Sequence, residues 1–210
     1  MISEKPQPFI FIHIPRCSGT SIERALLPLA ADGKTLEELS AAERKLHWLP
    51  GGRGRQHAKL AAYAREVNLG EFFKFAVVRN PWARAVSQIE YLRAKKKREI
   101  FTSDDFRENL RIYCEASHRI HGHDLGACQL DYLVDASGKM AMDYIGRFES
   151  LEQDFKKICQ KLGIKKPPVL PHIHASSRAK PYQEYYDKKT ADWIRRRFAR
   201  DIEYFGHEFE

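Results

Sequence analysis

The 210-residue sequence has no apolar run long enough to cross a membrane, because none of its hydrophobic stretches approaches about 18 residues. Residues 1–8 are polar and lack the apolar segment of a secretory signal. The four cysteines, at positions 17, 114, 128 and 159, include no Cys-x-x-Cys pair. Scattered cysteines of this kind are typical of free thiols in a reducing compartment. We therefore expect a cytoplasmic protein with no membrane span and no disulfide framework.

Acidic residues are outnumbered: 28 Asp and Glu stand against 36 Lys and Arg, which gives a net charge of +8. Such an excess favours anionic partners, among them nucleotides, nucleic acids, anionic polysaccharides and membrane surfaces, without selecting one of them. The composition is otherwise that of an ordinary globular protein. With no repeat and no long linker, the chain is predicted to form a single domain over residues 1–210.

Two unbroken apolar runs, residues 9–14 and 72–78, have the length and composition of buried parallel strands. Each is followed by a short loop and then by a helical pattern, the second of which opens with Asn80 and Pro81 as N-cap and first helical residue. A shorter strand is expected over residues 144–148. Alternation of strands and helices predicts an α/β fold.

The second half of the chain is predicted to be largely helical. Residues 104–134 have the pattern of one or two helices, and residues 188–205 that of a single last helix. Between them, Ser150 and Gln153 match a capping box that opens a helix closed by Gly163.

Residues 13–21, with the sequence HIPRCSGTS, connect the first strand to its helix. A loop in this place points main-chain N–H groups and a helix N-terminus into one small space, which suits a phosphate or sulfate group. Gly19 permits close approach, Thr20 and Ser21 offer hydroxyls, and Arg16 offers a permanent charge. The Walker A spacing is absent, and Glu23 stands where a protein-phosphatase loop needs Arg. A plain strand–helix turn is the alternative.

Residues 78–87, with the sequence VRNPWARAVS, connect the second strand to its helix. Arg79 stands at the carboxyl end of the strand, where open α/β sheets bind ligands. Ser87 lies two turns into the helix, so an Arg and a hydroxyl are available for a second phosphate group. A structural ion pair of Arg79 is the alternative.

These two segments resemble the 5′-phosphosulfate loop and the 3′-phosphate motif of the sulfotransferases that use 3′-phosphoadenosine 5′-phosphosulfate (PAPS). The similarity is to the branch with heparan 2-O- and carbohydrate sulfotransferases and short bacterial relatives. Its loop reads H-I-P-K-T-G-G-T-S, and its second motif, R-N-P-x-x-R-x-x-S, is matched in full. Residues 145–152, 185–187 and 201–206 are also similar to the family. The resemblance implies a P-loop-NTPase-like three-layer domain with a central, mostly parallel sheet flanked by helices.

The loop departs from the family pattern at three positions: Arg16, Cys17 and Ser18 stand where the family has Lys, Thr and Gly. Arg keeps the charge that stabilises the oxygen between the departing phosphate and the sulfuryl group, although its geometry differs from that of Lys. Ser in place of Gly requires a negative φ at residue 18.

The resemblance implies in-line transfer of a sulfuryl group from PAPS to a hydroxyl, with a saccharide as one possible acceptor. His57 matches the position of a family His and is the predicted general base, an exposed histidine being the alternative. Arg16 is the second predicted catalytic residue, and His13 is expected to point into a hydrogen bond beneath the loop. The residues implied to bind the donor are Arg16, Cys17, Ser18, Gly19, Thr20, Ser21, Arg79, Ser87 and Arg178.

No metal is implied, because PAPS carries no triphosphate that would need Mg²⁺. A cluster of potential ligands, Cys114, His118, His121, His123 and Cys128, matches no standard metal-site spacing. The basic stretches 53–59 and 93–98 favour an anionic acceptor, and nucleic acid is not expected as a partner. Two other functions stay open: a P-loop-type kinase for small molecules, and a non-catalytic nucleotide-binding relative.

Overall fold

The computed structural model describes residues 1–34, 38, 55–94, 101–115, 119–120, 123–124, 127–171, 173 and 180–210. Its residues form two compact units. The first comprises Met1–Val78 and Asp131–Ile173, and the second comprises Arg79–Leu130 and His174–Glu210. No helix within these described ranges has the length and apolar character needed to cross a bilayer.

A four-stranded sheet organises the first unit. Its strands lie in the order β1 (Ile2–Ser3), β2 (Phe9–Ile12), β3 (Phe73–Val78) and β6 (Tyr144–Arg147). Strand β1 is antiparallel to β2, whereas β2, β3 and β6 are parallel to one another. The sequence therefore located the three parallel strands correctly.

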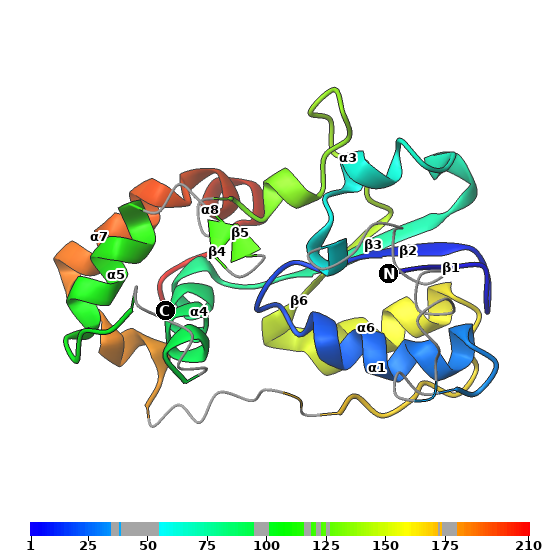
Figure 1. The fold of residues 1–210 in the computed structure, drawn as a ribbon, viewed down its shortest axis with the longest axis horizontal. Helices are drawn as coiled ribbons and strands as arrows, with labels where there is room; N and C mark the ends of the chain where they lie inside the picture. Colours follow the sequence, from blue (N-terminus) through cyan, green and yellow to red (C-terminus); the bar gives the residue numbers. More distant parts are fainter. Residues whose placement is uncertain are drawn as a thin grey trace. The chain divides into compact units, whose positions relative to one another are not determined.

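Helices cover the sheet of the first unit on both sides. Figure 1 shows α1 (Gly19–Ala30) and α6 (Leu151–Lys161) on one side and the short α3 (Leu60–Tyr63) on the other. Short 3₁₀ turns span Arg55–His57, Leu69–Glu71 and Phe148–Ser150. An α/β fold with a central, mostly parallel sheet flanked by helices is thus confirmed.

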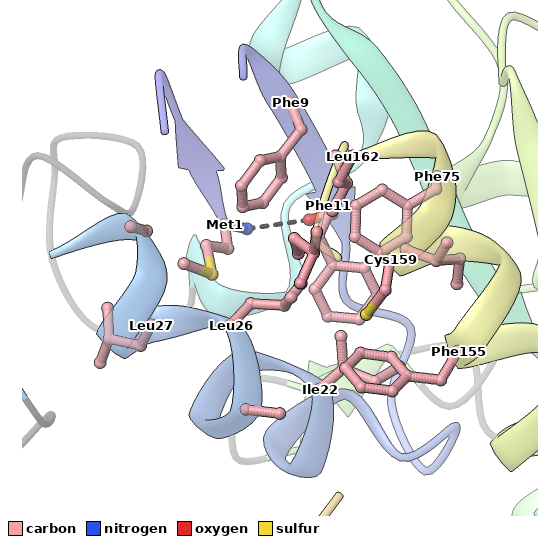
Figure 2. Packing of buried hydrophobic residues seen from close by; sticks show 14 of the residues in the cluster. Met1, Phe9, Phe11, Ile22, Leu26, Leu27, Phe75, Phe155, Cys159 and Leu162 are labelled. Atoms are coloured by element: carbon pink, nitrogen blue, oxygen red, sulfur yellow. Dashed lines mark hydrogen bonds between the residues drawn. The ribbon is translucent and has the colours of Figure 1, made fainter. Parts of the chain in front are cut away.

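Burial of aromatic and aliphatic side chains fixes α1 and α6 against the sheet. Figure 2 shows Phe11 and Phe75 from the sheet among side chains from both helices, and their rings lie 5.1 Å apart. Continuous apolar strands are expected to be covered on both faces, so this packing follows from the composition of β2 and β3. The residues that the two helices contribute to this core are Ile22, Ala25, Leu26, Leu27, Ala30, Phe155, Ile158 and Cys159.

The start of α6 differs from the prediction. Ser150 makes no side-chain cap; its hydroxyl donates instead to Asp154 Oδ2 at 2.7 Å, because an ionised carboxylate is the stronger acceptor. The predicted end is confirmed: Gly163 has a φ of 71°, and the N–H of Ile164 donates to the carbonyl of Cys159.

The second unit is mainly helical. Its helices are α4 (Pro81–Ala94), α5 (Phe106–Glu115), α7 (Lys188–Arg197) and α8 (Ala199–Phe205), with 3₁₀ turns at Leu130–Tyr132 and Tyr182–Tyr185. Helix α5 packs against α4 and α7 (Figure 1). Trp82, Phe198 and Tyr113 are among the largest side chains of this buried core.

Two helix predictions for the second unit are wrong in part. After α5 the chain forms a two-stranded antiparallel pair, β4 (Arg119–Ile120) with β5 (His123–Asp124), in place of a second helix. The predicted last helix is divided at Phe198, where φ is −115° and ψ is 30°. The apolar positions stay in phase across this break, so periodicity alone does not detect it.

Candidate functional site

The loop between β2 and α1 is closed by its own main chain. The N–H of Cys17 donates to the carbonyl of Ile14 at 3.3 Å, and its thiol lies 3.6 Å from the carbonyl oxygen of Pro15. Cys17 is buried, whereas Arg16, Ser18 and Thr20 are partly exposed. The exposed groups of the predicted anion loop are therefore those of Arg16, Ser18 and Thr20, and Cys17 turns toward the loop itself.

Two loop residues adopt the left-handed conformation: φ is 67° at Arg16 and 60° at Ser18. The negative φ that would let Ser replace Gly without strain is therefore not found at residue 18. The position keeps the backbone conformation that suits a glycine, and Ser occupies it at a cost of about 1–2 kcal/mol. Ser18 directly precedes α1 and makes no side-chain cap, so it does not occupy the N–H groups of the first turn.

Gly19 is required by a contact inside the protein. A Cβ on this residue would lie 1.9 Å from Cδ2 of His13. Real Cβ atoms do not approach other atoms so closely, so only glycine lets α1 begin directly above this ring. His13 therefore does lie beneath the loop, as expected.

A buried carboxylate, that of Glu23 on α1, also contacts His13. Its Oε1 is 3.1 Å from Nδ1 of His13, and its Oε2 accepts a 2.5 Å hydrogen bond from Nε2 of Gln56. Burial by itself would raise the pKa of Glu23, but His13, the amino group of Met1 and Gln56 together lower it to about 2. Glu23 is therefore an anion in the interior of the first unit.

In the sequence, Glu23 is notable only as the residue that excludes a phosphatase loop. A signal was present, because residues 19, 22, 23 and 26 share one face of a helix and the other three are small or apolar. A lone carboxylate on a core-facing stripe indicates a buried polar contact.

His57 is held beside the loop through the main chain of His13. Its Nδ1 lies 2.9 Å from the carbonyl oxygen of His13, and the two imidazole rings meet edge to face with centroids 4.5 Å apart. A carbonyl oxygen only accepts, so Nδ1 of His57 carries the hydrogen. In the neutral ring, Nε2 is then the basic nitrogen. The half-buried His57 thus stands next to the predicted anion loop in a defined tautomer.

In the second unit, Arg79 directly follows the last residue of β3 and is buried. The side chain of Gln129 holds its main chain at both polar groups: Oε1 accepts from the N–H of Arg79, and Nε2 donates to its carbonyl, each at 2.8 Å. Asn80 caps α4 as predicted, since its Oδ1 accepts from the N–H of Trp82. Ser87 is buried within α4.

Gln129 is fixed in turn by Asp201 on α8. The carboxylate of Asp201 accepts hydrogen bonds from the N–H groups of Gln129 and Leu130, at 2.8 and 2.9 Å. Asp201 is fully buried, and burial raises its pKa above the ordinary value of 3.8. The chain Asp201–Gln129–Arg79 therefore sets the main chain from which the Arg79 side chain extends, a role the sequence analysis did not assign.

Some predicted site residues lie outside the described ranges. Arg178, His118 and His121 lie outside them, and only the backbone of His123 is described. Within the described residues, no group of three or more His, Cys, Asp or Glu could hold a metal. All four cysteines are free thiols, as expected.

The basic stretches are described only in part. Residues 53–54 and 95–98 fall outside the described ranges. Lys59 lies over the ring of Tyr132, with Nζ 5.6 Å from its centroid. Arg93 lies 3.5 Å from carboxylate oxygens of Glu90 and Asp104. These two cations thus have contacts within the protein.

Comparison with known proteins gives the family of the chain. A model described as "Sulfotransferase family" matches residues 1–208. The chain is also 24% identical over 240 aligned residues to carbohydrate sulfotransferase 10 of Xenopus laevis, covering 99% of this chain and 66% of that protein. It thus spans just under two thirds of that relative's length. No solved structure matches the chain significantly. Because the family model covers almost every residue, this protein belongs to the sulfotransferase family.

Proposed function

We propose that this protein is a PAPS-dependent sulfotransferase that transfers a sulfuryl group to a hydroxyl of a saccharide acceptor, with His57 as the base. Family membership and the two matched motifs support the reaction class. The relative whose name specifies carbohydrate sulfotransfer supports a saccharide acceptor. The net charge of +8 is consistent with the anionic donor.

The observation that carries this proposal is the hydrogen bond between Nδ1 of His57 and the carbonyl of His13. His13 is the residue that opens the predicted anion loop, so the bond ties the base to the loop within one unit. The tautomer that it imposes leaves Nε2 ready to accept a proton. A histidine with only a packing role would not require hydrogen on Nδ1 or a hydrogen bond to the carbonyl of His13.

The proposed reaction is a single in-line displacement at sulfur. The acceptor oxygen forms a bond to sulfur, and the bond between sulfur and the bridging oxygen breaks, leaving its electrons on the phosphate of adenosine 3′,5′-bisphosphate. The hydroxyl proton passes to Nε2 of His57. The cation of Arg16 stabilises the charge that develops on the departing oxygen. As in phosphoryl transfer, most of the protein's contribution is positioning and charge.

The loop residues 16–21 are assigned to the phosphosulfate end of the donor, and Arg79 with Ser87 to its 3′-phosphate. Arg79 is suited to this task because its main chain is held at both polar groups by Gln129. With its main chain fixed, Arg79 loses only side-chain freedom when its guanidinium binds a phosphate. Arg178 is a further proposed contact to the donor.

Binding of the product tests the donor site without knowledge of the acceptor. We expect calorimetric titration to show that adenosine 3′,5′-bisphosphate binds and that Arg79→Ala abolishes this binding. Adenosine 5′-monophosphate is the matched ligand control, because it lacks only the 3′-phosphate. Tight binding of ATP with Mg²⁺ in place of the bisphosphate would favour a kinase.

Turnover tests the base. With radiolabelled PAPS and a panel of neutral and anionic saccharides, we expect sulfated product from the wild-type protein. His57→Ala should lower kcat by about 10²- to 10⁴-fold, the usual contribution of a general base, while bisphosphate affinity stays unchanged. If His57→Ala turns over like the wild type on the acceptor that the panel identifies, the base assignment is wrong. Bisphosphate binding without product from any acceptor would instead indicate a non-catalytic relative.

A further inference from the structure

Beneath the loop, Glu23 is a buried charge that the proposed reaction does not use. Its carboxylate is 4% exposed and carries a negative charge at neutral pH. An unpaired charge in a protein interior costs several kcal/mol, so such a group is retained only with close partners. The partners of Glu23 therefore indicate its structural role.

Two polar contacts of Glu23 connect it to His57 through one intervening residue each. Oε1 lies 3.1 Å from Nδ1 of His13, the residue whose carbonyl accepts the hydrogen bond of His57. Oε2 accepts from Nε2 of Gln56, the residue that directly precedes His57 in the same 3₁₀ turn. One carboxylate therefore contacts the side chain of His13, whose carbonyl accepts the His57 hydrogen bond, and the side chain of Gln56, which precedes His57.

The ring of His13 adds a third restraint, because it is confined from three directions. It lies directly under Gly19, meets the ring of His57 edge to face, and faces Glu23 through Nδ1. The ring has little freedom to rotate without losing one of these contacts. Glu23 thus holds the residue that connects the loop with the base.

We propose that Glu23 is a positioning residue for His57. Its buried carboxylate contacts both His13 and Gln56, and through them it maintains the His57 tautomer that carries hydrogen on Nδ1. This inference rests on the proposed function, in which Nε2 of His57 takes the acceptor proton. Glu23 does not touch the reacting atoms and carries no proton in the reaction. Its contribution is the orientation and tautomer of the base.

The variant Glu23→Gln tests this role with the smallest change in shape. The amide carries no charge, so it removes the electrostatic attraction to His13, and only its single carbonyl oxygen can still accept from Gln56. Gln56→Ala is the second variant: Gln56 is exposed, so this change removes one contact without opening a cavity. Asp154→Asn is the matched control, since Asp154 is a buried carboxylate of the same unit whose pKa is also about 2. Its partners are Tyr144, Ser150, Lys157 and the N–H of Arg147.

Two measurements on the full chain, with no acceptor and then with one, decide the question. Long-range ¹H–¹⁵N NMR of the histidine rings reports which nitrogen of His57 carries hydrogen. We expect hydrogen on Nδ1 in the wild type and in Asp154→Asn, and a shift toward Nε2–H in Glu23→Gln and Gln56→Ala. In turnover, we expect kcat of Glu23→Gln to fall about tenfold or more, while KM for PAPS and bisphosphate affinity change less than twofold.

The tautomer measurement separates failure of this inference from failure of the proposed function. If both variants keep the wild-type His57 tautomer, the inference is wrong, whatever the turnover shows. An equal tautomer change in Asp154→Asn would also overturn it, because the effect would then be general destabilisation. If the tautomer shifts as expected but no acceptor is ever sulfated, the positioning role stands and the proposed reaction fails.

Discussion

The imidazole ring of His13 occupies the space that a side chain on residue 19 would need, with Cδ2 only 1.9 Å from the position of a Cβ there. The glycine of the loop is therefore required by a histidine of the preceding strand end. His13 also contacts the buried Glu23 and His57, the proposed base, so the predicted donor loop and these two residues form one packed arrangement within the first unit. A change at one of these residues should consequently affect the others.

Gly19→Ala should destabilise the protein and damage the loop at the same time. The added methyl must displace the His13 ring or the start of α1, and overpacking of this kind costs about 1–3 kcal/mol. Thermal unfolding and bisphosphate titration measure the two effects. Gly70→Ala is the control, because a Cβ at residue 70 would lie at an ordinary contact distance, 3.4 Å, from Asn68 Oδ1. Equal stability of the two variants would contradict the packing of His13 under residue 19.

Ser18→Gly should stabilise the protein, in contrast to most substitutions. The left-handed φ of 60° is strained for Ser and free for Gly, so we expect a gain of about 1 kcal/mol in the free energy of unfolding. Urea denaturation measures this gain. Ser18→Ala keeps the strain and should bring no gain, which separates the effect of backbone conformation from loss of the hydroxyl.

Arg16→Lys and Arg16→Gln test the charge at the most unusual loop position. The lysine variant keeps the cation that the proposed mechanism assigns to the departing oxygen, so its kcat should stay within about tenfold of the wild type. The glutamine variant removes the cation, and kcat should fall by about 10²-fold or more, as on loss of one electrostatic contact to a transition state. Steady-state kinetics with PAPS gives both values. A wild-type rate for Arg16→Gln would show that the loop stabilises the leaving group without this side chain.

Gln129→Leu should destabilise the second unit and weaken bisphosphate binding. The substitution leaves the buried N–H and carbonyl of Arg79 without their partner, at about 1–3 kcal/mol for each group. Denaturation and calorimetric titration measure stability and affinity. Asn68→Ala is the control, since Asn68 also accepts a main-chain N–H but at an exposed site, and it should cost less than about 1 kcal/mol. A Gln129→Leu variant with unchanged affinity would show that the anchoring of Arg79 does not matter for the donor.

The depressed pKa of Glu23 predicts an acid-dependent part of the stability. Its pKa is about 2 in the folded protein against an ordinary 4.5, so the unfolded chain binds the proton more tightly. The resulting stabilisation, about 3 kcal/mol, is fully present above pH 4.5 and is lost as the pH falls toward 2. Urea denaturation of the wild type and Glu23→Gln across this range measures it. We expect the stability difference between them to shrink with falling pH; a difference independent of pH would contradict the ionised state of Glu23.

Much of the fold could be predicted from local patterns. The apolar runs of β2 and β3, the Asn80–Pro81 start of α4 and the closure of α6 at Gly163 each depend on neighbouring residues, and each was located correctly. The break at Phe198 was missed because its cause is not local. The apolar phase continues through it, and both halves pack into the same core.

By itself, the sequence determined the strand–loop–helix order, the two anion motifs and, through them, the similarity to sulfotransferases. These features are encoded by residues within a few positions of one another. Only the tertiary structure decided the sign of φ at Ser18 and the contacts of Glu23 with His13 and Gln56. It also decided the hydrogen bonds that link Asp201 to Gln129 and Gln129 to Arg79. The contacts join residues that are far apart in the chain, and the φ of Ser18 depends on how its loop is packed. Periodicity shows which face of an element is buried, but the partner that a buried polar group meets depends on which elements pack against it.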